Sequence, residues 1–137
     1  MARIVLDASA AVRVIQASEL SEELLRHLEH ASLVVTPDLY CSEVGNALWK
    51  YVRAGELSLE DATERLEEAL NLTDLMVPDS QLIAEALAAA AMYQHPVYDM
   101  MYAVLARRHG ATLVTVDRSF ASRLRGMQIG VFCPLPD

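Results

Sequence analysis

The stretch from Pro96 to Asp117, PVYDMMYAVLARRHGATLVTVD, constrains the fold more than any other part of the chain. Its apolar residues first recur at helical spacing, and Gly110 then precedes the run Ala-Thr-Leu-Val-Thr-Val, so the stretch predicts a helix, a turn and a strand. Between Val97 and Ala106 the only charge is Asp99, and every other side chain is apolar or aromatic. Such a helix is buried over most of its circumference. A carboxylate on it costs stability unless it has a partner or a cation.

Strands and helices alternate along the rest of the chain. We expect short strands at residues 3–7, 33–36, 72–77, 111–116 and 128–133. We expect helices at residues 9–15, 21–30, 37–54, 58–70, 81–93, 97–109 and 118–124. Because there is neither an internal repeat nor a low-complexity linker, this alternation predicts a single α/β domain over residues 1–137, with a largely parallel central sheet flanked by helices.

Composition supports one globular domain. The chain has 137 residues, 53% of them hydrophobic, which is enough for a single core. The amino-terminal apolar run is too short for a signal peptide, and the run from Ala86 to Tyr93 is far shorter than a membrane span, so we expect a cytoplasmic protein without membrane contact. Cys41 and Cys133 lack CxxC spacing, which favours ordinary packing residues over a disulfide.

The charges are unevenly distributed. A net charge of −8 argues at first against nucleic-acid binding, which needs cationic groups. Between Glu56 and Glu85, however, nine acids face only Arg65. From Met100 to Gly130 five arginines face only Asp117, and these are Arg107, Arg108, Arg118, Arg123 and Arg125. We predict that these five form a local basic lobe beside the stretch from Pro96 to Asp117. An ordinary solvated helix face remains the alternative for each arginine.

Four acids stand out by their positions. Asp7 and Asp117 end predicted strands, whereas Glu43 and Asp99 are lone charges on otherwise apolar helices. Thr115, two residues before Asp117, points to the same side of its strand. Simpler interpretations stay open, since Asp7 and Ser9 suit helix caps and Glu43 suits a surface charge.

Three histidines are weaker candidates. His27 and His30 share a helix face but lack a third ligand nearby, which favours a solvated pair. His95 lies four residues before Asp99, yet a loop histidine without a role is the simpler interpretation.

Convergence of the four acids would require a cation. Two carboxylates about 4 Å apart repel by roughly 4 kcal/mol at an effective dielectric constant near 20. A site made only of oxygen ligands favours Mg²⁺ or Mn²⁺ over Zn²⁺. Such sites typically carry out phosphoryl chemistry on a phosphate substrate.

Four segments resemble the PIN-domain ribonucleases, in particular the VapC-type toxins of bacterial and archaeal toxin–antitoxin pairs. They are VLDASA, SEVGNAL, VYDMMYAVLARRHG and LVTVDRSF, in that family's order and spacing. The resemblance implies that Asp7, Glu43, Asp99 and Asp117 form an acidic metal site for Mg²⁺ or Mn²⁺. It further implies supporting roles for the hydroxyls of Ser9 and Thr115 and for the amide of Asn46.

The same resemblance implies an activity and partners. The expected reaction is metal-dependent hydrolysis of an RNA phosphodiester to a 5′-phosphate and a 3′-hydroxyl. With RNA as the substrate, the residues expected to contact it are those of the basic lobe, Arg107, Arg108, Arg118, Arg123 and Arg125. The expected partners are a small VapB-like antitoxin, which occludes the acids with a basic side chain, and a second copy of the chain in a homodimer.

Two other classes of protein are possible. A PIN-like domain can serve as a non-catalytic RNA- or protein-binding module, although the presence of all four acids argues against this. Phosphotransfer receivers and aspartate-nucleophile phosphatases also have acidic sites on α/β domains. A receiver needs adjacent acids after its first strand and a late lysine, whereas here Asp7 is followed by Ala-Ser and the only lysine is Lys50. The phosphatases usually have a second aspartate where this chain has Ser9.

Overall fold

All the strands of the central sheet are parallel. The computed structural model describes residues 2–135, whose strands are β1 (Arg3–Leu6), β2 (Leu33–Pro37), β3 (Leu75–Val77), β4 (Thr112–Val114) and β5 (Val131–Phe132). They form one five-stranded sheet in the order β3-β2-β1-β4-β5, and every neighbouring pair is parallel. The predicted α/β fold with a largely parallel sheet is therefore confirmed.

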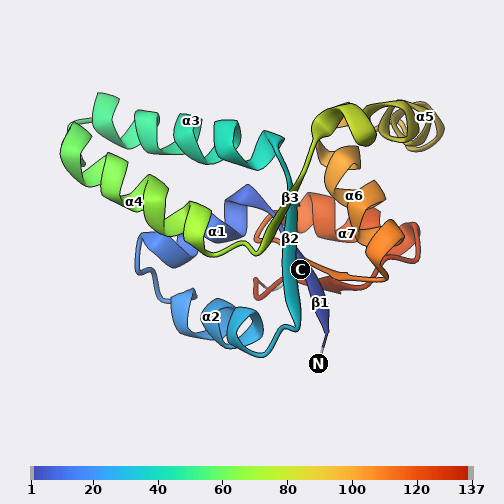
Figure 1. The fold of residues 1–137 in the computed structure, drawn as a ribbon, viewed down its shortest axis with the longest axis horizontal. Helices are drawn as coiled ribbons and strands as arrows, with labels where there is room; N and C mark the ends of the chain where they lie inside the picture. Colours follow the sequence, from blue (N-terminus) through green and yellow to red (C-terminus); the bar gives the residue numbers. More distant parts are fainter. Residues whose placement is uncertain (1, 136–137) are drawn as a thin grey trace.

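Helices cover both faces of this sheet. They are α1 (Ala8–Ile15), α2 (Ser21–Glu29), α3 (Leu39–Arg53), α4 (Leu59–Asn71), the short 3₁₀ helix η1 (Asp79–Gln81), α5 (Ile83–Tyr93), α6 (Val97–His109) and α7 (Arg118–Gly126). Figure 1 shows the sheet nearly edge-on, with α1 to α4 on one side and α5 to α7 on the other.

The strand order places a topological switch point between β1 and β4. After β1 the chain adds β2 and then β3 in one direction, and after β3 it returns to the other side of β1 to add β4 and β5. The connections that leave β1 and β4 therefore pass over opposite faces of the sheet. In open α/β sheets, ligands bind at such a switch point, outside the carboxyl ends of the strands.

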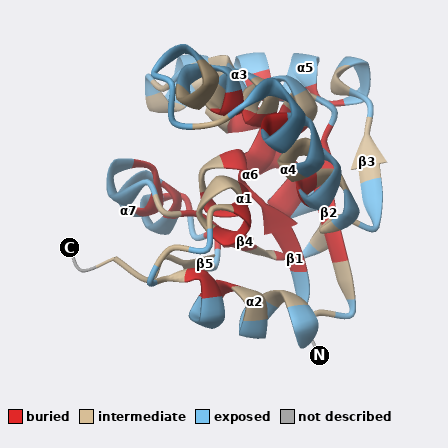
Figure 2. Ribbon diagram, turned by 90° about the vertical axis from the view of Figure 1, so that its left-hand side faces the viewer, coloured by how far each residue is buried: buried red, intermediate tan, exposed pale blue. Residues whose placement is uncertain are grey.

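Helix α6 is the central helix of the core. Residues Met100 to Ala106 are each at most 5% exposed, as the sequence predicts, and Figure 2 shows the middle of this helix in the colour of buried residues. It packs against β1, β2 and β4, and along its length against α5. The helix ends at Gly110, which takes the left-handed conformation (φ 58°) that glycine adopts without steric cost.

Several boundaries differ from the sequence prediction. The sequence predicts that Pro37 begins a helix, but Pro37 ends β2 opposite Val77, and α3 starts at Leu39. Strand β3 begins only at Leu75, because α4 continues to Asn71. Between the two elements, the Asp74 carboxylate accepts a hydrogen bond from Val34 N. Strands β4 and β5 are shorter than predicted, because only Thr112–Val114 and Val131–Phe132 pair with neighbouring strands. The predicted cap of α4 is confirmed, since Ser58 Oγ accepts from Asp61 N at 3.0 Å.

Both cysteines are free thiols, which agrees with their expected role as packing residues. Cys41 Sγ lies 3.5 Å from Met76 Sδ, between α3 and β3. None of the helices that the structure describes is long and apolar enough to cross a membrane.

Candidate active site

Asp7 stands at the carboxyl end of β1, where its backbone N–H still pairs with Val114 O at 3.0 Å. It occupies the N-cap position of α1, but its side chain makes no capping hydrogen bond. Instead, Asp7 Oδ2 accepts from Thr115 Oγ1 at 2.6 Å and from Ser9 Oγ at 2.8 Å. The capping interpretation of the Asp7 side chain is therefore wrong, and two hydroxyls fix the orientation of a carboxylate that is only 8% exposed.

The same hydroxyls hold the chain segment that follows β4. Thr115 Oγ1 accepts from Asp117 N at 3.0 Å, and Ser9 Oγ accepts from Val116 N at 3.2 Å. Asp117 is exposed and caps α7, because its Oδ1 accepts from Phe120 N at 3.0 Å. Asp117 is thus connected to Asp7 through the Thr115 hydroxyl, across the switch point between β4 and β1.

Glu43 approaches this edge of the sheet from α3. Its half-buried carboxylate accepts a hydrogen bond from Tyr102 Oη, with 2.6 Å between that oxygen and Oε1. Tyr102 belongs to α6, which lies on the opposite face of the sheet from α3 (Figure 1), and its side chain is completely buried. The bond therefore connects the two helices that carry Glu43 and Asp99.

Asp99 lies in the first turn of α6 and has a histidine partner. His95 Nε2 is 2.7 Å from Asp99 Oδ2, and the exposed fractions of the two side chains are 14% and 32%. The His95 ring also stacks on Phe120 of α7, with 5.7 Å between ring centroids and 12° between planes. His95, predicted to be a loop residue, thus lies before α6 and contacts both Asp99 and Phe120.

Three of the acids influence one another electrostatically. Burial is the main cause that raises the pKa of Asp7 above its ordinary value, and the Asp99 charge adds to it against the lowering effect of the two hydroxyls. Burial likewise raises the pKa of Glu43, where the Tyr102 hydrogen bond lowers it and the charges of Asp7, Asp99 and Asp79 raise it. The carboxylates of Asp7, Glu43 and Asp99 therefore lie near enough to one another to interact electrostatically.

Asp79, predicted only as part of a turn or cap, also contributes to this edge. Its Oδ1 accepts from Leu39 N at 3.0 Å, so it caps α3 rather than a helix of its own. Because α3 carries Glu43, this contact helps to place the first turns of α3 at the same edge of the sheet.

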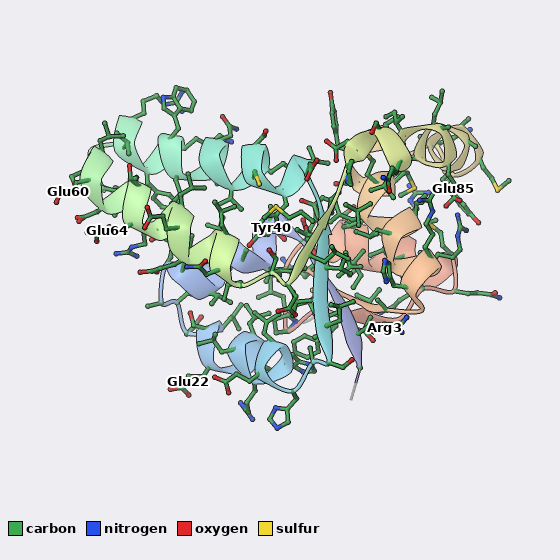
Figure 3. The ribbon with its side chains drawn as sticks, viewed as in Figure 1. Arg3, Glu22, Tyr40, Glu60, Glu64 and Glu85 are labelled. Atoms are coloured by element: carbon green, nitrogen blue, oxygen red, sulfur yellow. The ribbon has the colours of Figure 1, made fainter. Side chains whose placement is uncertain are left out.

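Asn46, Arg107 and Arg108 lie on the two helices that carry Glu43 and Asp99. Asn46 is exposed on α3, one turn after Glu43. Arg107 and Arg108 belong to the last turn of α6, and Arg108 Nε lies 3.7 Å from Glu85 Oε1. That turn lies near the amino ends of the strands, away from Asp7. Arg3, at the start of β1, donates from Nη1 to His109 O at 3.3 Å. Figure 3 labels Arg3 near the amino end of β1.

Arg118, Arg123 and Arg125 are carried by α7, which Asp117 caps. Arg123 donates from Nη1 to Tyr93 O at 3.1 Å. The arginines of the predicted basic lobe thus lie on two helices, a pair at the end of α6 and three on α7.

The donor set suits a hard cation, although it is not a preformed cage. All four predicted ligands offer carboxylate oxygens, the ligand type that Mg²⁺ and Mn²⁺ prefer. Repulsion among Asp7, Glu43 and Asp99 is unfavourable without a positive charge nearby. Within residues 2–135, no three His, Cys, Asp or Glu side chains are already placed to hold a metal ion together. Binding of an ion would therefore require the carboxylates to move closer together.

Comparisons with known proteins agree with this architecture. The family model described as PIN domain matches residues 4–124. Ribonuclease VapC3 of Pyrobaculum aerophilum is 34% identical over 123 residues, which are 88% of this chain and 94% of that protein. Ribonuclease VapC1 of Mycobacterium tuberculosis is 32% identical over 124 residues, or 89% and 91% of the two chains.

Solved structures share the fold. The crystal structure of PAE2754 from Pyrobaculum aerophilum superposes with a TM-score of 0.73 at 27% identity, covering 95% of this chain and 83% of that one. A toxin–antitoxin complex from Klebsiella pneumoniae gives a TM-score of 0.69 at 20% identity, covering 98% and 99%. The chain belongs to the PIN-domain family and, within it, to the VapC-type proteins.

Proposed function

We propose that this protein is a metal-dependent ribonuclease that acts as the toxin of a VapBC-type toxin–antitoxin pair. The observation that supports the proposal most is the placement of three acids. Asp7 follows β1 at the switch point, and Glu43 accepts a hydrogen bond from Tyr102 on the helix that carries Asp99. The charge of Asp99 contributes to raising the pKa of both Asp7 and Glu43. The names of the relatives, Ribonuclease VapC3 and Ribonuclease VapC1, support RNA as the substrate.

Asp7, Glu43, Asp99 and Asp117 are the residues that would hold Mg²⁺ or Mn²⁺. When bound, the ion supplies positive charge that neutralises the substrate phosphate and makes water a better nucleophile at neutral pH. The geometry supports unequal roles for the four carboxylates. Asp7 is held rigidly by Ser9 and Thr115, whereas Asp117 offers its ligand oxygen from an exposed helix cap.

The remaining steps follow from phosphodiester hydrolysis. Water attacks the phosphorus in line with the leaving 3′-oxygen, a bond to the water oxygen forms, and the bond to the 3′-oxygen breaks. The products are a 5′-phosphate and a 3′-hydroxyl, so the water loses a proton and the leaving oxygen gains one. Glu43, whose pKa is raised mainly by burial, accepts a proton more readily than an ordinary carboxylate and either takes it from the water or completes the ligand set.

A cleavage assay tests this proposal. The purified chain, freed of any antitoxin, is incubated with a mixture of cellular RNAs in EDTA, in Mg²⁺ and in Mn²⁺. We expect fragments with 5′-phosphates only when metal is present, and none from the Asp7→Asn variant. Cleavage in EDTA at the same rate would exclude the metal mechanism. RNA binding without cleavage under all three conditions would favour the non-catalytic binding module.

We also propose a VapB-like antitoxin as partner. Support comes from solved structures that share this fold and are toxin–antitoxin assemblies, the complex from Klebsiella pneumoniae and VapBC2 from Rickettsia felis. A basic side chain of such a partner, placed among Asp7, Glu43 and Asp99, would relieve their repulsion in the way that a metal does. Addition of the antitoxin should therefore abolish cleavage and reduce Mn²⁺ binding together.

A homodimer is the second assembly that we propose. The outer face of α5 supports it, because Ile83 and Leu87 are 44% and 60% exposed on one side of the helix and Met92 is 74% exposed near its end. Leu87→Glu should then convert a dimer into a monomer in light scattering after gel filtration. Leu59→Glu, at a 73% exposed leucine on α4, is the matched control and should leave the mass unchanged. A wild-type monomer would contradict the proposal.

A further inference from the structure

The hydrogen bond between Tyr102 and Glu43 connects a side chain of the core with a carboxylate of the acidic site. Tyr102 is completely buried in the core helix α6, and its hydroxyl donates to Glu43 Oε1 at 2.6 Å. This distance is at the short end of the range for a hydroxyl that donates to an oxygen acceptor. The two residues are 59 positions apart and belong to helices on opposite faces of the sheet.

The surroundings of Glu43 make this donor important. Asp7 and Asp99 both repel the Glu43 charge, and burial deprives it of water. A half-buried carboxylate with two like charges nearby gains by turning outward to solvent, unless a donor holds it in place. The Tyr102 hydroxyl is the donor that the structure provides.

Tyr102 is suited to hold Glu43 in place. Its ring is completely buried in the core, which fixes the position of its hydroxyl. A phenol ordinarily titrates near pH 10, so this hydroxyl stays protonated under physiological conditions. Because only Oε1 accepts from Tyr102, Oε2 retains its lone pairs for another ligand.

We infer that Tyr102 is a positioning residue of the acidic site, which orients the Glu43 carboxylate toward Asp7 and Asp99 so that the three can bind one divalent cation. The inference rests on the proposed function, since it assumes that the acids bind metal. Groups that hold metal ligands in place typically contribute 10- to 100-fold to metal affinity or activity. Tyr102 does not touch substrate, so its effect passes entirely through Glu43.

A pair of matched tyrosines tests the inference. Tyr40 is also completely buried, and its hydroxyl donates to Ala69 O at 2.6 Å, beside the end of α4 (Figure 3). Tyr102→Phe and Tyr40→Phe therefore each remove one buried hydroxyl bond of the same length. Mn²⁺ binding is measured by the decrease of the free-ion signal in electron paramagnetic resonance, and thermal melts in EDTA record stability.

Both variants should melt below the wild type in EDTA, but only Tyr102→Phe should raise the Mn²⁺ dissociation constant, by about 10- to 100-fold. Equal Mn²⁺ affinity of Tyr102→Phe and wild type would overturn the inference and leave the metal site intact. A wild type that binds no Mn²⁺ at millimolar concentration would instead overturn the proposed metal site and the inference with it.

A double-mutant cycle shows whether Tyr102 acts through Glu43. In the Glu43→Ala background, Tyr102→Phe should change Mn²⁺ affinity less than twofold, because the carboxylate that it positions is gone. A full effect in that background would also overturn the inference. If Tyr102→Phe does not fold, 3-fluorotyrosine at position 102 provides the test: Mg²⁺ should shift its fluorine resonance and leave that of 3-fluorotyrosine at position 40 in place. No shift at position 102, with Mg²⁺ bound, would contradict the inference.

Discussion

The hydroxyl of Thr115 donates to Asp7 Oδ2 at 2.6 Å, although the two residues are 108 positions apart in the chain. The parallel pairing of β1 with β4 makes this contact possible, because it brings Leu6 opposite Val114 and so places the residues that follow the two strands side by side. The bond connects the strand-end acid Asp7 with the segment that carries Asp117. It accounts for the orientation of Asp7 without any capping role.

Replacing Thr115 with valine should impair the site as well as the fold. Valine keeps the shape, but it leaves Asp7 Oδ2 with one donor fewer and Asp117 N without its acceptor. We expect a loss of stability of about 1–3 kcal/mol. We also expect Mn²⁺ affinity and RNA cleavage to fall roughly 10- to 100-fold.

Thr36→Val is the control for this change. Thr36 is as fully buried as Thr115, and its hydroxyl donates to Leu6 O at 3.0 Å. It should lose comparable stability in urea titrations yet keep the metal affinity of the wild type. If both valine variants lose metal binding equally, the effect of Thr115→Val comes only from a general loss of stability.

Asp99→Asn separates a metal ligand from an ordinary helix-terminus charge. In EDTA, asparagine removes repulsion against Asp7 and Glu43 and can still accept or donate a hydrogen bond to His95, so the melting temperature should stay unchanged or rise. With Mn²⁺ the wild type should gain RT ln(1 + [L]/Kd), about 2.7 kcal/mol at a hundredfold excess over Kd, and the variant much less.

Asp61→Asn is the matched control, since Asp61 also lies in the first turn of a helix but is exposed on α4. Its melting temperature should fall slightly and by the same amount with EDTA and with Mn²⁺, because only a favourable helix-terminus charge is removed. An Asp99→Asn variant that behaves in this way would remove Asp99 from the metal site.

Much of the architecture was predictable from local sequence. Apolar runs that end on Asp7 and Asp117 indicated buried strands whose carboxyl ends meet at one sheet edge, and the structure has both residues there. The all-apolar neighbourhood of Asp99 indicated a core helix, and α6 is one. These features depend on periodicities of two and 3.6 residues, which a sequence displays directly.

The supporting contacts were not predictable in this way. Tyr102 is one apolar position among many in α6, and only the packing of α3 across the sheet edge brings Glu43 to its hydroxyl. Asp79 likewise caps α3 from 40 positions away. His95 had the spacing of a partner for Asp99, but α6 begins only at Val97, so helical periodicity did not extend to it. The direction of a loop side chain is decided by tertiary contacts, here the stacking on Phe120.

The buried carboxyl of Asp7 predicts a dependence of stability on pH. Its folded-state pKa lies above its ordinary value of 3.8, mainly through burial, so the folded protein holds this proton more tightly than the unfolded chain. The resulting stabilisation is fully present below pH 3.8 and is lost as the pH rises through the folded-state pKa. Asp7→Asn cannot ionise and should escape this loss.

In EDTA, the melting temperature of Asp7→Asn minus that of the wild type should therefore increase between mildly acidic and neutral pH. The buffers must be metal-free, because a bound cation stabilises the ionised carboxylate and reverses the trend. A difference that stays constant over this range would show that Asp7 ionises normally in the folded protein.

The positions of Arg118 and Arg107 predict different effects on RNA binding, because the two residues lie near opposite ends of the strands. Arg118 directly follows Asp117 at the acidic edge, whereas Arg107 lies eight residues after Asp99 on α6, about 12 Å farther along the helix axis. Arg118→Gln should weaken RNA binding and reduce the slope of log affinity against log salt by about one unit for each phosphate that the side chain no longer neutralises. Arg107→Gln, the matched control at the far edge, should change neither.

Both the affinity and its salt dependence are measured by fluorescence anisotropy with a labelled RNA and the cleavage-deficient Asp7→Asn chain, and thermal melts confirm that each variant is folded. Equal effects of the two substitutions would extend the RNA surface along the whole of α6, and no effect of either would place it away from the arginines.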